Sequence, residues 1–321
     1  MNGPIFPQPI LLVRAASRSR KDFHWRKMAA TQTGPQPSNT SWTREYSSAS
    51  EMRRPWNLLK GIFGDLWSGR ALARRLFIRN LTSTYRQSLL GFLWILVPTL
   101  AQIATWSFLA KQNLLVSEQL PGVPYLVFIA VGSLLWQLFF DAIQAPLQSV
   151  NGNQGIITRV NFPRESLILV SLSEVLFDFA IRSILVLSIC LYFGMSWTIG
   201  TLLVPVMAVG LFLLGISIGL LLTPIGILYH DIGRSLTILS PFWMVLTPVI
   251  YVVPETPIYR LWSAANPPAG LLSSARDLLL TGHSSMLEIG FIWLGLSVPI
   301  FLIALVWFRL GFPIFVERLA N

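Results

Sequence analysis

The sequence predicts an all-α integral membrane protein, and three observations lead to this fold class. Hydrophobic residues make up 53% of the 321 residues and charged residues only 12%, about half the charged fraction of a typical soluble domain. Six apolar runs are long enough to cross a bilayer. The loops that join these runs keep most of their positive charge on one side.

The first apolar run, Leu89 to Ala110, contains no charged residue, and as a helix it would extend about 33 Å. Five further runs follow: Tyr125 to Ala145, Leu167 to Phe193, Ile199 to Leu228, Leu236 to Val253 and Ile289 to Phe308. Because the number of crossings is even, both ends of the chain are expected on the same side of the membrane.

The distribution of Lys and Arg predicts which side that is. From residue 70 onward, the side of the termini would hold Arg70, Arg74, Arg75, Arg79, Arg86, Arg159, Arg164, Arg234, Arg309 and Arg318, and the opposite side Lys111, Arg260 and Arg276. Ten against three places both termini in the cytoplasm by the positive-inside rule. We therefore expect a multi-pass protein of the cytoplasmic (inner) membrane.

Residues 1–60 are predicted to form a disordered, basic N-terminal extension, because they show no sustained period and are rich in Ser, Pro, Gln and Arg. Two other interpretations stay open: an organelle transit peptide, or a true start at Met52. The extension carries +7 of the net charge of +10 (ten Lys and Arg against three Asp and Glu), which leaves only +3 for residues 61–321. This balance argues against nucleic acid as a partner.

Directly before the first apolar run, Asp65 to Gln87 is predicted to be an amphipathic helix in the cytoplasmic membrane interface. Its apolar positions at helical spacing are Leu66, Ala73, Phe77, Leu81 and Tyr85, and the basic positions on another face are Arg75, Arg79 and Arg86. The arginines and Tyr85 would contact lipid headgroups. The alternative is a solvated basic helix held by a few apolar contacts.

Several catalytic chemistries lack their residues in this chain. The four lysines all follow residues other than glycine, which excludes a phosphate-binding P-loop. The three histidines are far apart, and the single cysteine, Cys190, can form neither an intramolecular disulfide nor a cysteine-based zinc site. We expect no cofactor, no metal and no catalytic residue in this chain.

Four charged residues fall inside apolar runs: Asp141, Glu174, Asp178 and Arg182. Charged side chains are costly in lipid, so an interior or functional position is expected for each. Asp178 and Arg182 are four residues apart and are predicted to pair on one helix face. A substrate contact or proton relay is the alternative for this pair.

The segment Asn151 to Glu165 is a polar, glycine-containing interruption between the second and third apolar runs. Its Asn and Gly residues end a helix, Ile156 and Ile157 form a small apolar knob, and Phe162-Pro163 sets a turn. Such a loop can present a short rigid element to a partner. An ordinary polar connection is the alternative.

The outer segment, residues 254–283, is too rich in proline and charge for two full crossings. Asn266 is predicted to cap a short helix that starts with two prolines and ends at Gly282. Short re-entrant helices here could gate an exit. The candidate channel or gate residues of the chain are Trp94, Asp178, Arg182, Tyr251, Trp262 and Arg276.

Three groups of motifs together resemble the permease subunits of type-two ATP-binding-cassette exporters, in the polysaccharide and polyol-phosphate branch. They are Tyr85 to Pro98 at the first run, Asn151 to Glu165, and the set His230 to Arg234, Thr247 to Tyr251, Asn266-Pro267 and Arg276-Asp277. The resemblance covers about residues 64 to 320. Ile168 departs from it, because the family often has proline there.

The resemblance implies a non-catalytic, six-span permease domain over residues 61–321. It implies two copies forming a channel and a separate ATPase subunit that carries ATP and Mg²⁺. The segment Asn151 to Glu165 would be the coupling segment, which docks on that ATPase. Its proposed coupling residues are Ile156, Ile157, Arg159, Phe162, Pro163, Arg164 and Glu165.

The resemblance also implies the cargo, a lipid-linked polysaccharide or related glycopolymer such as O-antigen, capsule or teichoic acid. Two alternatives remain from the sequence. One is a lipid or drug exporter of the same architecture. The other is a membrane-embedded glycan-processing enzyme, which would need a catalytic cluster in the outer loops, where Glu255, Arg260 and Asp277 are scattered.

Overall fold

The computed structural model describes residues 55–86, 88–112, 120, 122–157, 165–195, 197–229, 231–252 and 256–320; the side chains of residues 55–59, 85, 156–157 and 313–320 are not among the features described. Every regular element in these ranges is a helix. The predicted N-terminal extension lies outside the described residues up to residue 54.

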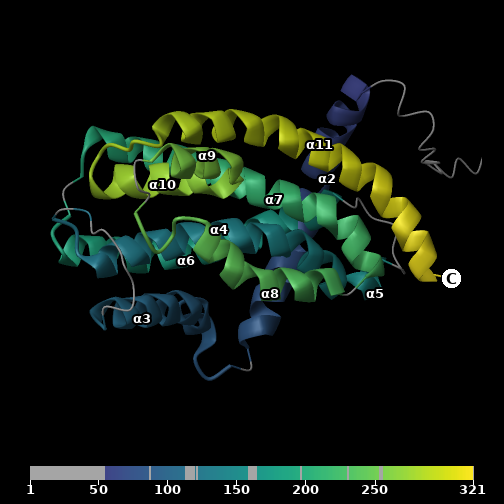
Figure 1. Cartoon of the computed structure of the whole chain (residues 1–321). Coiled ribbons are helices and arrows are strands. Elements are labelled where there is room, and N and C mark those ends of the chain that lie inside the picture. Colours follow the sequence, from purple (N-terminus) through teal and green to yellow (C-terminus); the bar gives the residue numbers. More distant parts are fainter. Residues whose placement is uncertain are drawn as a thin grey trace, which may run out of the picture. The chain divides into compact units, whose positions relative to one another are not determined.

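Ten α-helices and two 3₁₀ turns are described in chain order (Figure 1). The α-helices are α2 (Pro55–Tyr85), α3 (Val97–Lys111), α4 (Tyr125–Gly152), α5 (Gln154–Ile157), α6 (Glu165–Tyr192), α7 (Val204–Leu228), α8 (Asp231–Leu246), α9 (Pro257–Ala265), α10 (Pro267–Leu280) and α11 (Leu287–Ala320), and the 3₁₀ turns are η2 (Gly91–Ile95) and η3 (Ile199–Leu203).

Within the described ranges, four helical segments are long and apolar enough to cross a membrane: Tyr125–Gly152, Glu165–Tyr192, Ile199–Leu228 and Leu287–Phe312. They coincide with the second, third, fourth and sixth apolar runs of the sequence. Within the described residues, the predicted all-α fold with several helices long and apolar enough to span a membrane is thereby confirmed.

The first and fifth apolar runs form shorter helices than the sequence predicts. Gly91 adopts a positive φ of 52° and begins the 3₁₀ turn η2, so the continuous helix α3 holds only 15 residues, or about 22 Å. The fifth run forms α8, with 16 residues, which ends before Pro248 because the residue preceding a proline disfavours helical geometry. Six full crossings therefore stay a prediction.

Helix α4 is the central helix of the bundle and packs against α3, α6, α7, α8 and α10. Its contact with α7 is close because three glycines of α7, Gly215, Gly219 and Gly226, face it. A Cβ built onto Gly215 would lie 2.5 Å from the carbonyl oxygen of Phe139, and one on Gly219 would collide with the carbonyl oxygen of Ile143. Small residues at a helix contact let the backbones approach, as is typical of helices packed in lipid.

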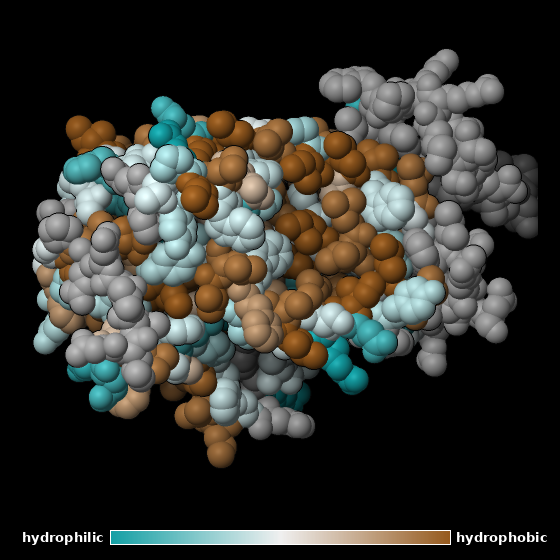
Figure 2. Space-filling view, viewed as in Figure 1, coloured by the Kyte–Doolittle hydropathy of each residue, from teal (hydrophilic) through white to brown (hydrophobic). Residues whose placement is uncertain are grey.

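Large apolar side chains remain exposed over much of the surface, and Figure 2 shows them as brown areas across the face it presents. On α8 they include Ile238, Leu239 and Phe242. A soluble monomer rarely exposes apolar area on this scale, so lipid or further subunits are expected to cover it.

Helix α2 starts at Pro55, ten residues before the predicted amphipathic helix and inside the range predicted to be disordered. Proline suits the first turn of a helix, where its missing N–H is not needed. Ile62, Ala73 and Leu76 are buried, and the helix packs against α6 and α11. Trp67 is 71% exposed, with the Arg70 guanidinium 4.0 Å above its ring.

Candidate functional site

The predicted coupling segment connects α4 to α6, and its described part is short. The backbone of Ile156 and Ile157 is helical, in α5. Glu165 is the first residue of α6 and is 8% exposed. The four other predicted coupling residues, Arg159, Phe162, Pro163 and Arg164, lie outside the described residues, so their roles stay predictions.

Near its start, the coupling segment is attached to two helices through Asn153, which is 2% exposed. The Asn153 amide donates to the carbonyl of Ser149 across 2.6 Å, at the end of α4. The guanidinium of Arg79, on α2, donates to Asn153 Oδ1 across 2.5 Å. The predicted contact of Arg79 with lipid headgroups stays a prediction, and in the structure its guanidinium hydrogen-bonds to the protein. Arg75 and Arg86 are exposed.

At its end, the coupling segment is attached through Glu165. Arg309 Nη1, on α11, lies 3.1 Å from Glu165 Oε1 and 3.0 Å from Asp65 Oδ2 on α2. All three side chains are at most 17% exposed. Sequence reasoning did not find this cluster, because its members are more than 90 residues apart and each one taken alone resembles an ordinary boundary charge.

Arg182 is buried in α6, and its ion pair is with Asp141 of α4, not with Asp178 as the four-residue spacing predicts. Its Nε also donates to the carbonyl of Ile95 in η2, across 3.1 Å. The four-residue spacing places Asp178 on the same helix face as Arg182. It does not fix the direction of the Arg182 guanidinium, which points toward α4. Glu174 accepts a hydrogen bond from Asn80 of α2, at 2.9 Å.

A neutral polar chain joins α3 to α4 inside the bundle. The hydroxyl of Thr99 donates to Gln137 Oε1 across 2.7 Å, and Gln137 Nε2 donates to Gln102 Oε1 across 3.1 Å. Trp94, a predicted channel residue, lies just before α3 and is 52% exposed. The charged residues inside the apolar runs were singled out from the sequence, whereas the uncharged Thr99, Gln102 and Gln137 were not predicted to interact.

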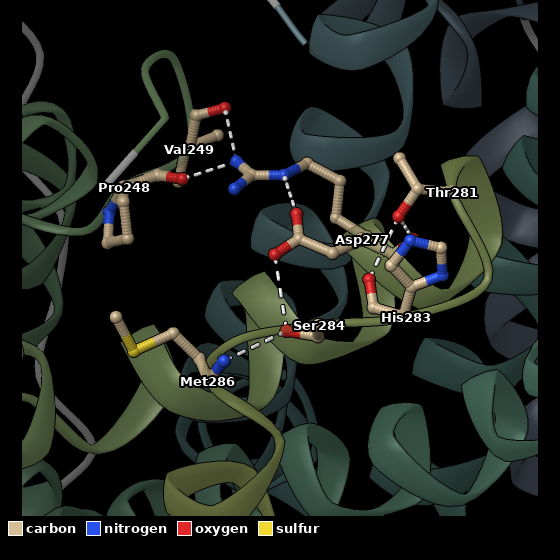
Figure 3. A network of polar contacts seen from close by, with 8 residues as sticks. Pro248, Val249, Asp277, Thr281, His283, Ser284 and Met286 are labelled. Carbon is tan, nitrogen blue, oxygen red and sulfur yellow. Dashed lines mark hydrogen bonds and ion pairs between the residues drawn. The ribbon is translucent and has the colours of Figure 1, made fainter. Parts of the chain in front are cut away.

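At the opposite end of the bundle from α5 (Figure 1), Arg276 of α10 is fully buried, at 1% exposed. Its Nη1 donates to the carbonyl of Pro248 across 2.5 Å and reaches that of Val249 at 3.5 Å, as Figure 3 shows. The guanidinium carbon also lies 4.0 Å from the centre of the Phe128 ring, on α4. Burial lowers the pKa of Arg276, whereas the neighbouring Asp277 raises it.

Asp277 extends this network toward the start of α11. Its Oδ1 lies 3.3 Å from Arg276 Nε, and its Oδ2 accepts a hydrogen bond from the Ser284 hydroxyl at 3.2 Å. That hydroxyl in turn accepts from the backbone N–H of Met286 (Figure 3). Arg276 therefore joins the turn after α8 to the α10–α11 connection.

The predicted short helix of the outer segment is present as α10, preceded by α9. Asn266 is the residue before α10, but its side chain does not cap that helix. Its amide instead donates to Thr247 Oγ1 across 3.0 Å and accepts from Trp243 Nε1 across 3.2 Å. Trp262 of α9 donates to the carbonyl of Leu246, so α9 and α10 are both tied to the end of α8.

The structure thus brings Tyr251, Trp262 and Arg276 to one end of the bundle around the end of α8, whereas Trp94, Asp178 and Arg182 lie on the side of η2 and α6. The predicted gate residues form two groups, and the structure does not gather them in a single site. That these residues line a channel or gate stays a prediction.

Two known export permeases have sequences similar to this chain. It is 26% identical over 214 residues to the O-antigen export system permease protein RfbA of Myxococcus xanthus, covering 65% of this chain and 80% of that protein. It is 27% identical over 212 residues to the protein of the same name from Klebsiella pneumoniae, covering 64% of this chain and 78% of that protein. No family model matches the chain. The resemblance to export permeases that the motifs indicate is confirmed by these relatives.

Proposed function

We propose that this chain is the membrane subunit of an ATP-driven exporter that moves a lipid-linked O-antigen or related glycopolymer across the cytoplasmic membrane. The similarity to two O-antigen export permease proteins, spread over nearly two thirds of the chain, is the observation that carries this proposal. The long apolar helices support it, because a hydrophilic cargo needs a protein path through the bilayer.

Energy for export would come from a separate ATPase subunit that holds ATP and Mg²⁺, because the chain has no P-loop. The coupling segment would dock on that subunit. Its position supports this role, since α5 lies at the end of the bundle opposite α10 (Figure 1). The positive-inside rule puts this end in the cytoplasm.

A second copy of the chain would complete the channel. The exposed apolar side chains of α3 and α8, such as Phe108 and Phe242, support a further helix contact in the membrane. The exposed arginines of α2, together with Trp67, would contact the lipid headgroups of the inner leaflet. In this arrangement α3 and α8 complete six crossings, and α9 and α10 dip from the outer face as an exit gate.

Deletion of the gene, followed by locating the polymer, tests this proposal. We expect glycan to accumulate inside the cell and to return to the surface when the wild-type gene is supplied. A gene carrying Arg164→Ala with Glu165→Ala should fail to restore export although the protein is present in the membrane. Normal surface glycan in the deletion strain would refute the proposal.

A further inference from the structure

The cluster of Asp65, Glu165 and Arg309 joins three helices at one point. One guanidinium nitrogen of Arg309 contacts both carboxylates, so α2 and the start of α6 share a single cation from α11. Removing one partner from a buried ion pair leaves an uncompensated charge, which makes such a junction hard to separate. The end of the coupling segment is therefore held firmly to α2.

The backbone of α2 packs closely against its neighbours beside this cluster. A Cβ built onto Gly69 of α2 would lie 3.1 Å from the Cβ of Ser166, the residue after Glu165. A Cβ on Gly61 would lie 3.4 Å from Arg309 Nη2. The two glycines thus let α2 lie against both the first turn of α6 and the guanidinium.

The other end of the coupling segment is attached to the same helix. Arg79 of α2 donates to the buried Asn153, directly before α5. Asp65 and Arg79 are about four helical turns apart, so the two attachments lie well separated along α2. A shift of the segment as a whole would therefore either break both attachments or move α2 with it.

We infer that α2 receives the movement of the coupling segment, and that Arg309 is the positioning residue that fixes α2 to it. The inference rests on the proposed function, because it needs an ATPase that displaces the coupling segment. In this arrangement α2 is a moving part of the exporter as well as a membrane-surface helix. Arg309 extends the same movement to α11, one of the long apolar helices.

The test uses the full chain, copurified with its ATPase subunit and reconstituted in vesicles, and measures glycan moved per ATP hydrolysed. Arg309→Gln should lower this ratio about tenfold, whereas Lys111→Gln, at an exposed lysine that ends α3, should leave it within about twofold of the wild type. A wild-type ratio in Arg309→Gln would overturn the inference.

A disulfide separates a positioning role from loss of folding. Gly69→Cys and Ser166→Cys, in a Cys190→Ala background, place two Cβ atoms 3.1 Å apart. A shift of about 0.5 Å brings them into the roughly 3.5–4.5 Å range of a disulfide. When the two cysteines are added to the Arg309→Gln chain, oxidation should restore the ratio of glycan moved to ATP hydrolysed. Reduction of the same sample should lower that ratio again. Failure to restore it, or loss of export when the disulfide forms in a chain that keeps Arg309, would overturn the inference.

Hydrogen exchange of the wild-type complex distinguishes this inference from the proposed function. ATP should change amide exchange both in α5 and in α2. If it changes α5 alone, the inference is wrong even when glycan moves. If it changes both helices and no glycan moves, the inference stands and the proposed cargo is wrong.

Discussion

Arg182 on α6 and Asp141 on α4 form an ion pair that joins the two helices within the bundle. The Arg182 side chain is 8% exposed and that of Asp141 is 34% exposed. Arg182 also holds the carbonyl of Ile95, so one guanidinium connects α4, α6 and the turn that leads into α3. The position of α3 therefore depends on a residue of another helix.

Replacing Arg182 by Met should destabilise the chain by about 2–4 kcal/mol, because Asp141 and the Ile95 carbonyl lose their shared donor. The measurement is the thermal unfolding midpoint of the purified protein in detergent. Asp178→Asn is the control, since Asp178 is not part of the ion pair, and it should change the midpoint little. Equal effects of the two variants would contradict the assignment.

Replacing Arg276 by Met should lower the free energy of unfolding by about 3 kcal/mol, because the carbonyl of Pro248 and the carboxylate of Asp277 lose a fully buried partner. Hydrogen exchange in the turn after α8 should rise in this variant. The matched control is Arg260→Met, whose ion pair with Glu288 is exposed and contributes at most about 1 kcal/mol. Unchanged exchange in Arg276→Met would show that the guanidinium does not hold this turn.

Gly215→Ala should destabilise the α4–α7 contact by about 1–3 kcal/mol, because the new methyl group would meet the Phe139 carbonyl oxygen. Gly295→Ala is the control. No neighbouring atom lies within 4 Å of a Cβ at Gly295, on α11, so this change should be neutral or slightly stabilising. The thermal unfolding midpoints of both variants in the same detergent measure the difference in stability. A similar drop in midpoint for both variants would contradict close α4–α7 packing.

Single cysteines in a Cys190→Ala background test the orientation of the chain. A cysteine at Arg75, exposed on α2, should react with a membrane-impermeant maleimide only in inverted vesicles. A cysteine at Glu288, exposed at the start of α11, should react only from the outside of spheroplasts. Labelling of both positions from one side would contradict the predicted topology.

The sequence predicts the long apolar helices well, because an apolar run in lipid must satisfy its backbone as a helix. It also predicts α10, whose start carries two prolines after Asn266. It does not predict the short α3, since the break depends on the positive φ of Gly91 rather than on composition. Nor does it predict where α2 begins.

Site residues are predicted less well than helices, because their partners come from distant parts of the chain. The sequence identifies Arg182 and Arg276 as buried or functional charges, but the partners of Arg182 are set by helix packing, which local spacing does not report. Arg309 was assigned only to the cytoplasmic side. Its two carboxylate partners lie 144 and 244 residues away in the sequence.

We propose that this chain is a conduit whose energy comes from a different polypeptide, and reconstitution in vesicles is the decisive test. Vesicles containing the chain and the copurified ATPase subunit should move lipid-linked glycan when ATP is supplied, and vesicles containing the chain alone should move none. Glycan moved or chemically changed by the chain alone would contradict the claim, as would an ATP-supplied complex that leaves glycan where it was.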